Sequence, residues 1–437
     1  MKRLKLIAVI WLCATFATAK DYYVAANGCD RNDGSISKPF ATLAKAYQTA
    51  GREGDAIYLR GGTYKITESQ IMNNSDKLNA RVFYFDKKAE QQHPLTISGY
   101  RHERVVFDLS AVKPRGKRVQ VFYINGNCHH LKNFEVVGVQ VTIKSHTQSE
   151  NIRIDGGNHN VVENVAMHDG MGLGVYISRG IGNTILNSDA YNLDDRVSEG
   201  GRNENTDGFG GHPASASSTG NKFVGCRAWN CGDDGFDLIG AFAPVAVQNC
   251  WAFNNGYKKN GTGSGGNGNG FKAGGYGMAE HPRVPSVIPR HIVSNCIAYD
   301  NKAHGFYSNH HLGGITFINN SAFNNAVNYS GLNRKSASVA ADVDGYGHVF
   351  CNNVSVSPRA KGCDIVKADR QKCHIENNTF LNKKIKRVER SYFESLDPAR
   401  LSAPRKADGS LPDITFLKPK AGTILDINSM GRRAMLR

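Results

Sequence analysis

The 437-residue sequence has no CxxC pair, only 3 Trp and 13 Pro, and fewer acidic residues (38) than basic ones (54). The missing cysteine pairs argue against a structural zinc knuckle. The ten cysteines are dispersed along the chain, which is more typical of buried core thiols than of a dense disulfide scaffold. Because 40% of the residues are apolar and 9% aromatic, an intrinsically disordered chain is excluded.

No apolar run is long enough to span a bilayer, and the one at the N-terminus has a different character. Three basic residues precede an apolar run at 6–16, which ends in the small-residue sequence Ala17-Thr18-Ala19. This order is typical of a secretory signal peptide. We therefore expect residues 1–19 to be removed near Ala19 and the mature chain to be exported to the periplasm or the medium.

Motifs for nucleic-acid binding are also missing, although the net charge is +16. The densest basic run, at 383–390, has no interleaved aromatic residue, and no zinc-finger, helix-turn-helix or RNP pattern occurs. A strongly basic exported protein still favours a polyanionic partner. The expected partner is an acidic polysaccharide rather than a nucleic acid, and we expect the protein to act as a monomer.

One short motif recurs along the chain. Its members are residues 187–192 (NSDAYN), 225–230 (GCRAWN), 249–254 (NCWAFN), 295–300 (NCIAYD) and 319–324 (NNSAFN), with 163–168 (ENVAMH) as a weaker member. The step is 24 residues from Ala166 to Ala190, from Ala228 to Ala252 and from Ala298 to Ala322, and the longer steps contain insertions. Short strands that repeat at such a period indicate a solenoid whose coils stack on one another.

These repeats predict an all-β protein, a right-handed parallel β-helix, in which equivalent residues of adjacent coils lie about 4.8 Å apart. We expect the asparagines that begin the motif, Asn187, Asn249, Asn295 and Asn319, to form an interior ladder of side-chain amides at a turn. Small alanines and large aromatics should point to opposite faces of each strand. The alternative is an antiparallel sandwich with unrelated asparagine turns.

The ends of the solenoid are expected to be covered. Apolar residues at 40, 43, 44 and 47 predict a short amphipathic helix that caps the N-terminal end. Residues from about 384 to 437 are basic and irregular, and should wrap the outside of the solenoid or fray. Residues 20–437 are thus expected to form a single β-helix domain.

A second register carries the chemistry, because Gly-Phe recurs at 208–209, 235–236, 270–271 and 305–306. If these pairs stack, Asp207 lies over Asp234, and Asp237 lies over Lys272. Together with Asp233, four carboxylates and one ammonium group would lie within roughly two coil spacings. Such a cluster requires protonation or a bound cation. Calcium is favoured because it takes six to eight oxygen ligands; the alternative is an ordinary Asp-Asp-Gly turn.

These residues resemble a known family, the family 9 polysaccharide lyases. The similarity runs from about residue 22 to about 425 and is most specific at 207–210 (DGFG), 223–229 (FVGCRAW), 233–238 (DDGFDL) and 267–272 (NGNGFK). Members of that family are calcium-dependent pectate lyases on a right-handed parallel β-helix. The resemblance implies that Asp207, Asp233, Asp234 and Asp237 bind the catalytic Ca²⁺ and that Lys272 is the Brønsted base.

The implied chemistry agrees with the residue types. β-Elimination from a polyuronate such as polygalacturonate removes the proton on C5 and expels the oxygen on C4, and a bound cation stabilises the developing negative charge. A lysine can act as the base because burial and a nearby cation lower its pKa, whereas an arginine stays protonated. The alternative for Lys272 is an ion pair with Asp237 without a catalytic role. Lys302, His304 and Tyr307, one coil further on, are candidates for contacts with substrate.

Two other functions remain open at this point. Asn205-Thr206-Asp207-Gly208, Gly232-Asp233-Asp234 and His304-Gly305 resemble motifs of the β-helix polygalacturonases, which are hydrolases. A non-catalytic carbohydrate-binding β-helix would also explain the repeats, the export and the charge. Neither alternative gives a role to both Asp237 and Lys272, so the sequence favours a secreted pectate lyase.

Overall fold

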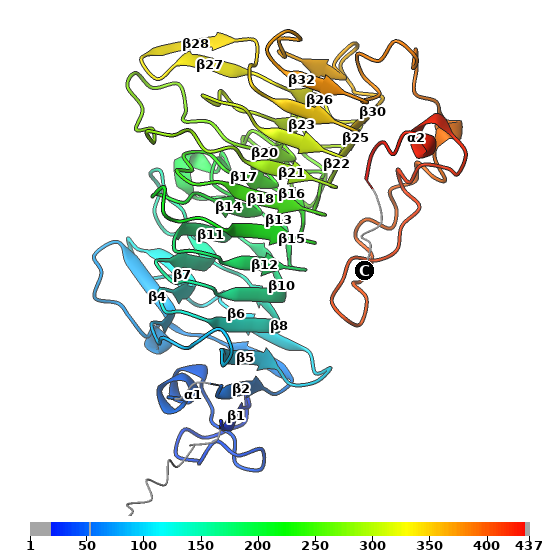
Figure 1. The fold of residues 1–437 in the computed structure, drawn as a ribbon. Coiled ribbons are helices and arrows are strands. Elements are labelled where there is room, and N and C mark those ends of the chain that lie inside the picture. The colour runs from blue at the N-terminus through cyan, green and yellow to red at the C-terminus, as the bar shows by residue number, and fades with distance from the viewer. Residues whose placement is uncertain (1–18, 52–53, 433–437) are drawn as a thin grey trace, which may run out of the picture.

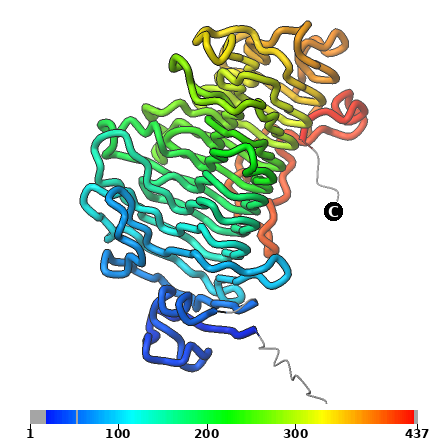
Figure 2. Tube along the Cα trace, turned by 60° about the vertical axis from the view of Figure 1, so that its left-hand side comes forward, coloured from blue at the N-terminus to red at the C-terminus, as the bar shows by residue number. Residues whose placement is uncertain are grey.

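The chain folds into a parallel β-helix, as Figures 1 and 2 show for the computed structural model, which describes residues 19–51 and 54–432. Its strands run in three ladders, one on each side of the solenoid, and every ladder pairs strands in parallel. The predicted signal peptide lies outside the described residues apart from Ala19. Within the described ranges, no helix is long and apolar enough to cross a membrane.

The three ladders are named here as the first, second and third face. The first face contains β1 (Asp21–Val24), β2 (Ala56–Leu59), β5 (Leu95–Gly99), β8 (His129–Val137), β10 (Val161–Gly170), β12 (Thr184–Leu186), β15 (Asn221–Val224), β18 (Val245–Gln248), β21 (Ile292–Ser294), β24 (Thr316–Ile318), β29 (Val349–Cys351) and β32 (His374–Glu376). The second face contains β3 (Gly62–Lys65), β6 (Val105–Asp108), the later parts of β8 and β10, β13 (Asp189–Leu193), β16 (Arg227–Cys231), β19 (Trp251–Phe253), β22 (Ile297–Tyr299), β25 (Ser321–Phe323) and β30 (Val354–Val356). The third face contains β4 (Asn79–Phe85), β7 (Arg118–Ile124), β9 (Glu150–Asp155), β11 (Leu173–Arg179), β14 (Phe209–Gly211), β17 (Phe236–Asp237), β20 (Phe271–Lys272), β23 (His304–Tyr307), β26 (Val327–Ser330) and β31 (Ile365–Val366).

A few elements lie outside these faces. An antiparallel hairpin of β27 (Asn333–Ser336) and β28 (Val339–Val343) projects near the C-terminal end of the solenoid (Figure 1). The helical elements of residues 19–51 and 54–432 are α1 (Leu43–Thr49), α2 (Ile424–Ile427) and single 3₁₀ turns at Glu68–Gln70, Ser198–Gly200 and Arg390–Tyr392. Since almost all regular structure is parallel strand, the predicted all-β solenoid is confirmed.

The alanine repeat sets the register of the second face. Ala190, Ala228, Ala252, Ala298 and Ala322 pair in order on successive coils and are fully buried. The predicted 24-residue step from Ala166 to Ala190 is wrong, because Met167 is the residue that pairs with Ala190.

The asparagine turns explain this shift. Asn164 and Asn187 both have a left-handed backbone, with φ of 49° and 48°. Asparagine tolerates this conformation better than other non-glycine residues, so it fixes where the chain turns from the first face to the second. Met167 and Ala190 each lie three residues after such an asparagine.

The predicted ladder of amides forms in part, since Asn295 Nδ2 donates to Asn249 Oδ1 at 3.3 Å, but it lies at the turn and not in the interior. Asn187, Asn249, Asn295 and Asn319 adopt left-handed φ between 48° and 57° and are only half-buried. The residue after each of them points inward: Ser188, Cys250, Cys296 and Asn320 are fully buried. The side-chain ladders in the core therefore include Asn320, Asn353 and Asn378, and separately Asn255, Asn301 and Asn325.

Helix α1 covers the N-terminal end of the solenoid, as predicted. It begins at Leu43 because the Thr42 side chain accepts a hydrogen bond from the Lys45 backbone N–H at 3.2 Å. Phe40 was expected to lie within the helix, but its backbone pairs with Tyr23 and Ala25 and continues the sheet. Leu43, Ala46 and Tyr47 are buried against the first coils.

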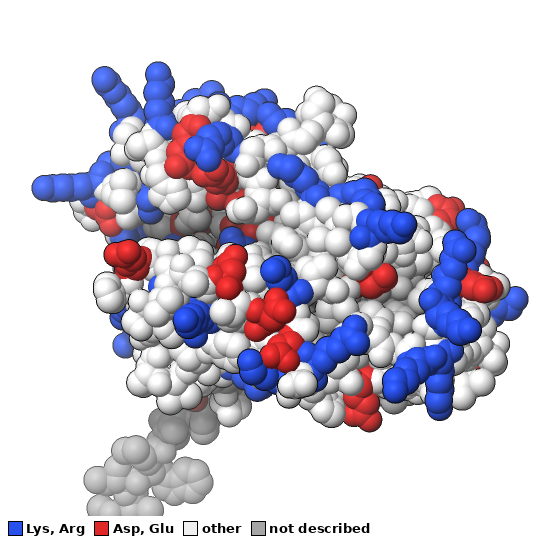
Figure 3. All heavy atoms as spheres, turned by 90° about the horizontal axis from the view of Figure 1, so that it is seen from above, with Lys and Arg blue, Asp and Glu red and all other residues white. Residues whose placement is uncertain are grey.

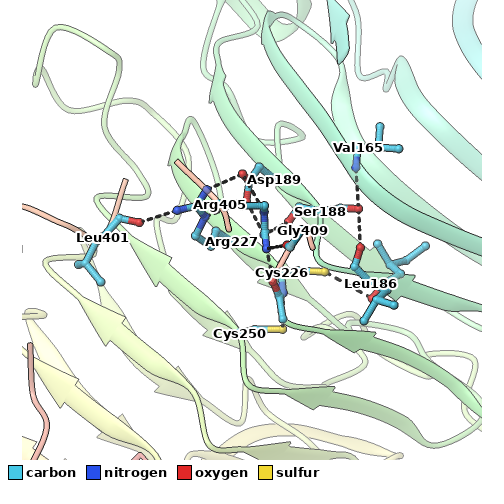
Figure 4. A network of polar contacts seen from close by, with 12 residues as sticks. Val165, Leu186, Ser188, Asp189, Cys226, Arg227, Cys250, Leu401, Arg405 and Gly409 are labelled. Atoms are coloured by element: carbon cyan, nitrogen blue, oxygen red, sulfur yellow. Dashed lines mark hydrogen bonds and ion pairs between the residues drawn. The ribbon is translucent and has the colours of Figure 1, made fainter. Parts of the chain in front are cut away.

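The C-terminal segment, residues 384–432, runs along the outside of the second face (Figure 1). Apolar side chains of this segment, among them Phe393, Leu401 and Phe416, form a second hydrophobic cluster with Trp251 and Ile297. Figure 4 shows the polar centre of the contact, where Asp189 lies between Arg227 and Arg405. The segment is thus attached by both apolar and charged contacts.

Candidate functional site

A stack of phenylalanines inside the third face positions the candidate site. Phe209, Phe236, Phe271 and Phe306 are buried on successive coils, with ring centroids 4.9–5.0 Å apart. Since alternate residues of a strand point to opposite sides, the residue after each phenylalanine points outward. These residues are Gly210, Asp237, Lys272 and Tyr307, and they pair in this order.

Four carboxylates gather at this outer column. Asp207, Asp233, Asp234 and Asp237 are all buried, with exposed fractions of 0–5%. Carboxylate oxygens of Asp207, Asp234 and Asp237 lie within 4.8 Å of one another. Asp233 is adjacent but outside this group, and its Oδ1 accepts a hydrogen bond from the Asn267 backbone N–H at 2.6 Å.

Lys272 faces the carboxylates from the next coil. Its Nζ lies 3.0 Å from Asp237 Oδ2 and 3.1 Å from Asp234 Oδ2. Burial alone would lower the pKa of Lys272, but the four surrounding carboxylates together hold it well above its usual value. In the absence of another cation, Lys272 is therefore a protonated ion-pair partner.

One ammonium group does not neutralise four carboxylates, and the raised pKa values of the aspartates reflect this imbalance. Burial and the charge of Asp233 raise the pKa of Asp207 well above its ordinary value. Burial, followed by the charge of Asp234, raises the pKa of Asp233 to about 8. The pKa of Asp234 is also raised, chiefly by burial. The cluster thus holds protons unless a cation takes their place.

Backbone and amide donors fix one oxygen of each of three carboxylates. Asp207 Oδ1 accepts the Asp234 backbone N–H at 3.0 Å, and Asp237 Oδ1 accepts the Ile239 N–H at 2.7 Å. Asp234 Oδ1 accepts the backbone and side-chain N–H groups of Asn269 at 2.7 and 2.8 Å. Among the described residues, no hydrogen bond reaches Asp234 Oδ2, whose contact is the ion pair with Lys272.

This donor set fits a calcium ion. It offers several carboxylate oxygens from two adjacent coils, and flexible coordination by six to eight oxygens is what Ca²⁺ accepts. The metal ligands that softer transition ions prefer, thiolate and imidazole, do not belong to this group of three aspartates. Asp207, Asp234 and Asp237 are the residues that could hold such an ion, with Asp233 beside them.

The three residues expected to contact substrate have defined partners. Lys302 Nζ donates to the backbone carbonyls of Ser264 and Gly266 at 2.8 and 2.9 Å, and so fixes the loop that leads to Asn267. These bonds use two of the three N–H donors of the Lys302 ammonium group. His304 Nδ1 lies 2.8 Å from Asn269 Oδ1, which orients the amide that binds Asp234.

His304 and Tyr307 line the column next to Lys272. Their rings stack at 4.3 Å, and Tyr307 pairs directly with Lys272. Burial lowers the pKa of His304 to about 4, so this ring is uncharged near neutral pH. Of the three candidates Lys302, His304 and Tyr307, Tyr307 is the one that lies in the same column as Asp237 and Lys272.

One residue of this site was missed from the sequence, His212. Its ring stacks on Tyr176 at 4.4 Å, and its Nδ1 lies 2.6 Å from the Ile239 carbonyl oxygen. A Cβ on Gly210 would come within 2.6 Å of His212 Nε2, so the glycine makes room for the ring. Burial lowers the pKa of His212. Gly210 lies in the same column as Asp237 but has no side chain. This gap in the sequence pattern was the signal that another side chain occupies the space at this coil.

Comparisons with known proteins match both the fold and the site region. The family model described as "Pel9A-like, right handed beta helix region" matches residues 22–342. Pectate lyase L of Dickeya dadantii (strain 3937) is 33% identical over 420 residues, which cover 95% of this chain and 87% of that protein. Pectate lyase L of Paenibacillus polymyxa (strain SC2) is 31% identical to this chain, and the aligned residues cover 94% of this chain and 84% of that protein.

Two solved structures agree over nearly the whole chain. A structure titled rhamnogalacturonan lyase superposes with a TM-score of 0.91 at 45% identity, over 94% of this chain and 99% of that one. The structure of pectate lyase Pel9A superposes with a TM-score of 0.73 at 30% identity, over 93% and 91% of the two chains. These matches confirm the right-handed sense of the β-helix.

Proposed function

The chain belongs to the Pel9A-like right-handed β-helix family, the family 9 pectate lyases, and on this premise we propose that it cleaves an acidic pectic polysaccharide by cation-assisted β-elimination. In this proposal Lys272 removes the C5 proton, and Asp207, Asp233, Asp234 and Asp237 hold a calcium ion. The observation that carries it is the contact of Lys272 with Asp234 and Asp237 at 3.1 and 3.0 Å inside a buried carboxylate cluster.

The reaction needs a base beside a site that binds a carboxylate. The bound ion would attract the uronate carboxylate and stabilise the negative charge that develops at C5. The neutral Lys272 amine takes the C5 proton, the C–H electron pair becomes the C4–C5 double bond, and the C4–O bond breaks with its electrons on the leaving oxygen. That oxygen then takes up a proton, so two shorter chains result.

Lys272 must lose its own proton before it can act as a base. In the structure, the charges of Asp237 and Asp234 favour its ammonium form. Asp234 and Asp237 would lose this effect on Lys272 with a cation bound to them, and the burial of the amine would then lower its pKa. The need for a metal ion and the use of lysine as the base thus both follow from the charge and the burial of this carboxylate cluster.

The test is ultraviolet absorbance by unsaturated uronate products, with calcium and with a chelator. The wild-type protein is expected to produce calcium-dependent absorbance, and Lys272→Ala and Lys272→Arg to lose nearly all of it, since arginine stays protonated. Lys222→Ala, an exposed lysine of the first face, is the matched control with unchanged activity. Melting temperatures establish that all variants fold.

The same assay separates the remaining functions. New reducing ends without absorbance would mean a polygalacturonase-type hydrolase. Binding of the polymer without any cleavage would mean a carbohydrate-binding β-helix. Full activity of Lys272→Ala would contradict the role of the lysine whatever the reaction.

Two substrates are proposed from the relatives. Polygalacturonate is favoured by the matches to pectate lyases over most of the chain. The backbone of rhamnogalacturonan, in which galacturonate alternates with neutral rhamnose, is favoured by the 45% identity to a rhamnogalacturonan lyase structure. Initial rates on the two purified polymers decide between them. We also propose export, from the N-terminal sequence pattern.

A further inference from the structure

The last strand of the first face, β32, is paired on one side only. It lies at the C-terminal end of the solenoid and pairs with β29 through three residues (Figure 1). No strand of the described residues follows it on this face. An edge strand this short is among the parts of a fold that open most easily. Contacts between the side chains of β29 and β32 therefore matter for how firmly the solenoid ends.

Three side chains of metal-binding type lie together on the outer surface of these two strands. His374 and Glu376 are two positions apart on β32, on either side of Ile375, which packs against the core. Cys351 is the register partner of Glu376 on β29 and follows the buried Phe350. One ligand atom of each of the three lies within 4.8 Å of the others. Two adjacent strands thus bring sulfur, nitrogen and oxygen atoms together.

The group is accessible to an ion from solvent. The side chains of His374 and Glu376 are 60% and 68% exposed, and Cys351 is half-buried. His374 Nε2 lies 3.0 Å from Glu376 Oε2, and in the part of the chain that the structure describes neither side chain has another ion-pair partner. Zinc bonds of about 2.0–2.3 Å place tetrahedral ligand atoms about 3.5 Å apart. Small rotations of exposed side chains are enough to reach that arrangement.

The coils directly before this group carry no metal ligand in the same two columns. Toward the N-terminus, Cys351 is preceded by Ile318 and then Ser294. His374 is preceded by Val349 and then Thr316. The ligand set therefore coincides with the end of the ladder and does not continue along the face.

The ligand types favour zinc over calcium. Thiolate and imidazole are ligands that Zn²⁺ prefers, whereas Ca²⁺ takes oxygen ligands. A cysteine, a histidine and a glutamate fill three positions of a tetrahedral site, and water can fill the fourth. On binding, the Cys351 thiol gives up its proton to solvent, and His374 keeps its ring proton on Nδ1 so that Nε2 can face the ion.

The residues that follow the two strands hold the end of the C-terminal segment. Asn352 directly follows β29, and its carbonyl oxygen accepts the Gly431 backbone N–H at 2.6 Å. Asn377 directly follows β32 and donates to the Asn428 carbonyl oxygen at 2.6 Å and to Asn352 Oδ1 at 2.7 Å. An ion that fixes β32 on β29 would also fix these contacts.

We propose that Cys351, His374 and Glu376 form a zinc site that fastens β32 to β29 and stabilises the C-terminal end of the solenoid. The site lies on the first face, apart from the aspartate cluster of the third face, and its role is structural. It thus goes beyond the proposed function and does not depend on it. The observation that carries it is the convergence of three different ligand types from two paired strands.

The test uses Co²⁺ as a spectroscopic probe of the reduced, full-length protein in the presence of calcium. Wild type is expected to bind a single Co²⁺ with the near-ultraviolet absorbance of a thiolate–cobalt bond, and Zn²⁺ should displace it. Co²⁺ at the aspartate cluster would not give this absorbance, because that group has no sulfur ligand. Cys351→Ser should lose the absorbance, and His374→Ala should bind the probe at least tenfold more weakly. Cys363→Ser, which removes another half-buried thiol, is the matched control with unchanged binding.

Melting temperatures test the structural role. Zinc is expected to raise the melting temperature of wild type and of Cys363→Ser by a few degrees, but not that of Cys351→Ser. Wild type without thiolate absorbance, or Cys351→Ser that retains it, would overturn the site. Binding unaffected by His374→Ala would assign the ion to the thiol alone and overturn the three-ligand site. Zinc binding without a rise in melting temperature would overturn its role in stability.

Discussion

At the residue scale, the acidic cluster couples protonation to folding. Asp233 keeps its proton in the folded, metal-free protein up to pH about 8, whereas an unfolded aspartate releases it near pH 4. Between these values the folded state binds more protons than the unfolded state. The free energy of unfolding therefore falls as the pH rises through this window, the opposite of the usual behaviour of a paired aspartate.

This sign gives a prediction for melting temperature. In chelator, the protein is expected to melt at a lower temperature at about pH 8 than at about pH 5, because the buried carboxylates lose their protons. Added calcium should raise the melting temperature more at the higher pH, where it competes with fewer protons. Differential scanning fluorimetry at both pH values measures this.

Other groups also titrate in the window, so Asp233→Asn is the control. The variant keeps an oxygen that can accept the Asn267 N–H but has no proton to release. Its melting temperature in chelator should decline less between the two pH values than that of wild type. An equal decline in both proteins would contradict the assignment to Asp233.

At the scale of elements, the C-terminal segment depends on a buried charge cluster. Both oxygens of Asp189 are paired, with Arg227 at 2.7 Å and Arg405 at 2.6 Å. Burial alone would raise the pKa of Asp189, but the two guanidinium groups hold it below its ordinary value. Arg227 also donates to the backbone carbonyl of Leu401 (Figure 4). A second bond runs from Arg227 to the backbone carbonyl of Ala403. The cluster thus joins strands β13 and β16 to the segment.

Asp189→Ala is expected to destabilise the protein by about 3–5 kcal/mol, since two buried guanidinium groups lose their counter-charge. Limited proteolysis should then cut the segment at 384–432 first, while the lyase site on the third face keeps its activity. Lys406→Ala is the matched control, because Lys406 pairs with Asp413 at the exposed surface, where such pairs contribute less than about 1 kcal/mol. Uncut Asp189→Ala protein with wild-type stability would contradict this account.

The strands of the solenoid were predictable because their register depends on local signals. The alanine repeat and the Gly-Phe pairs recur in the same local sequence context although the steps between them vary in length, and both pair as the sequence predicts from Ala190 and from Phe209 onward. The one wrong step, at Ala166, arose because Ala166 was aligned by residue type, whereas the left-handed Asn164 sets the register. Conformation, not side-chain size, decides where each coil turns onto the second face.

The site was predictable only where it follows this register. Asp237 and Lys272 were paired from the sequence, and the structure has them in contact. His212 was not found, since it follows β14 and its ring reaches the Asp237 column only through the space beside Gly210. The inserted loop that positions Asn267 has no repeat, so its hydrogen bond to Asp233 could not be inferred.

At the scale of the whole molecule, net charge and shape act together. The net charge is +16, and Figure 3, a view onto the C-terminal end of the solenoid, shows many Lys and Arg side chains projecting around its edge. A polyanionic chain that approaches the third face thus meets an overall attractive field, which raises the rate of encounter. This field acts over a Debye length, about 10 Å at 0.1 M salt.

Salt should therefore affect long and short substrates differently. We expect added sodium chloride to raise the KM for the polymer several-fold between low and high ionic strength, because screening weakens the long-range attraction. The kcat should change little, because Lys272 and its carboxylates are buried and screened much less. For a short oligosaccharide with few charges, the increase in KM should be smaller. Initial rates at fixed calcium over a range of salt concentrations measure both constants. An equal salt effect on polymer and oligosaccharide would mean that the attraction arises from charges within the binding site and not from the net charge of the protein.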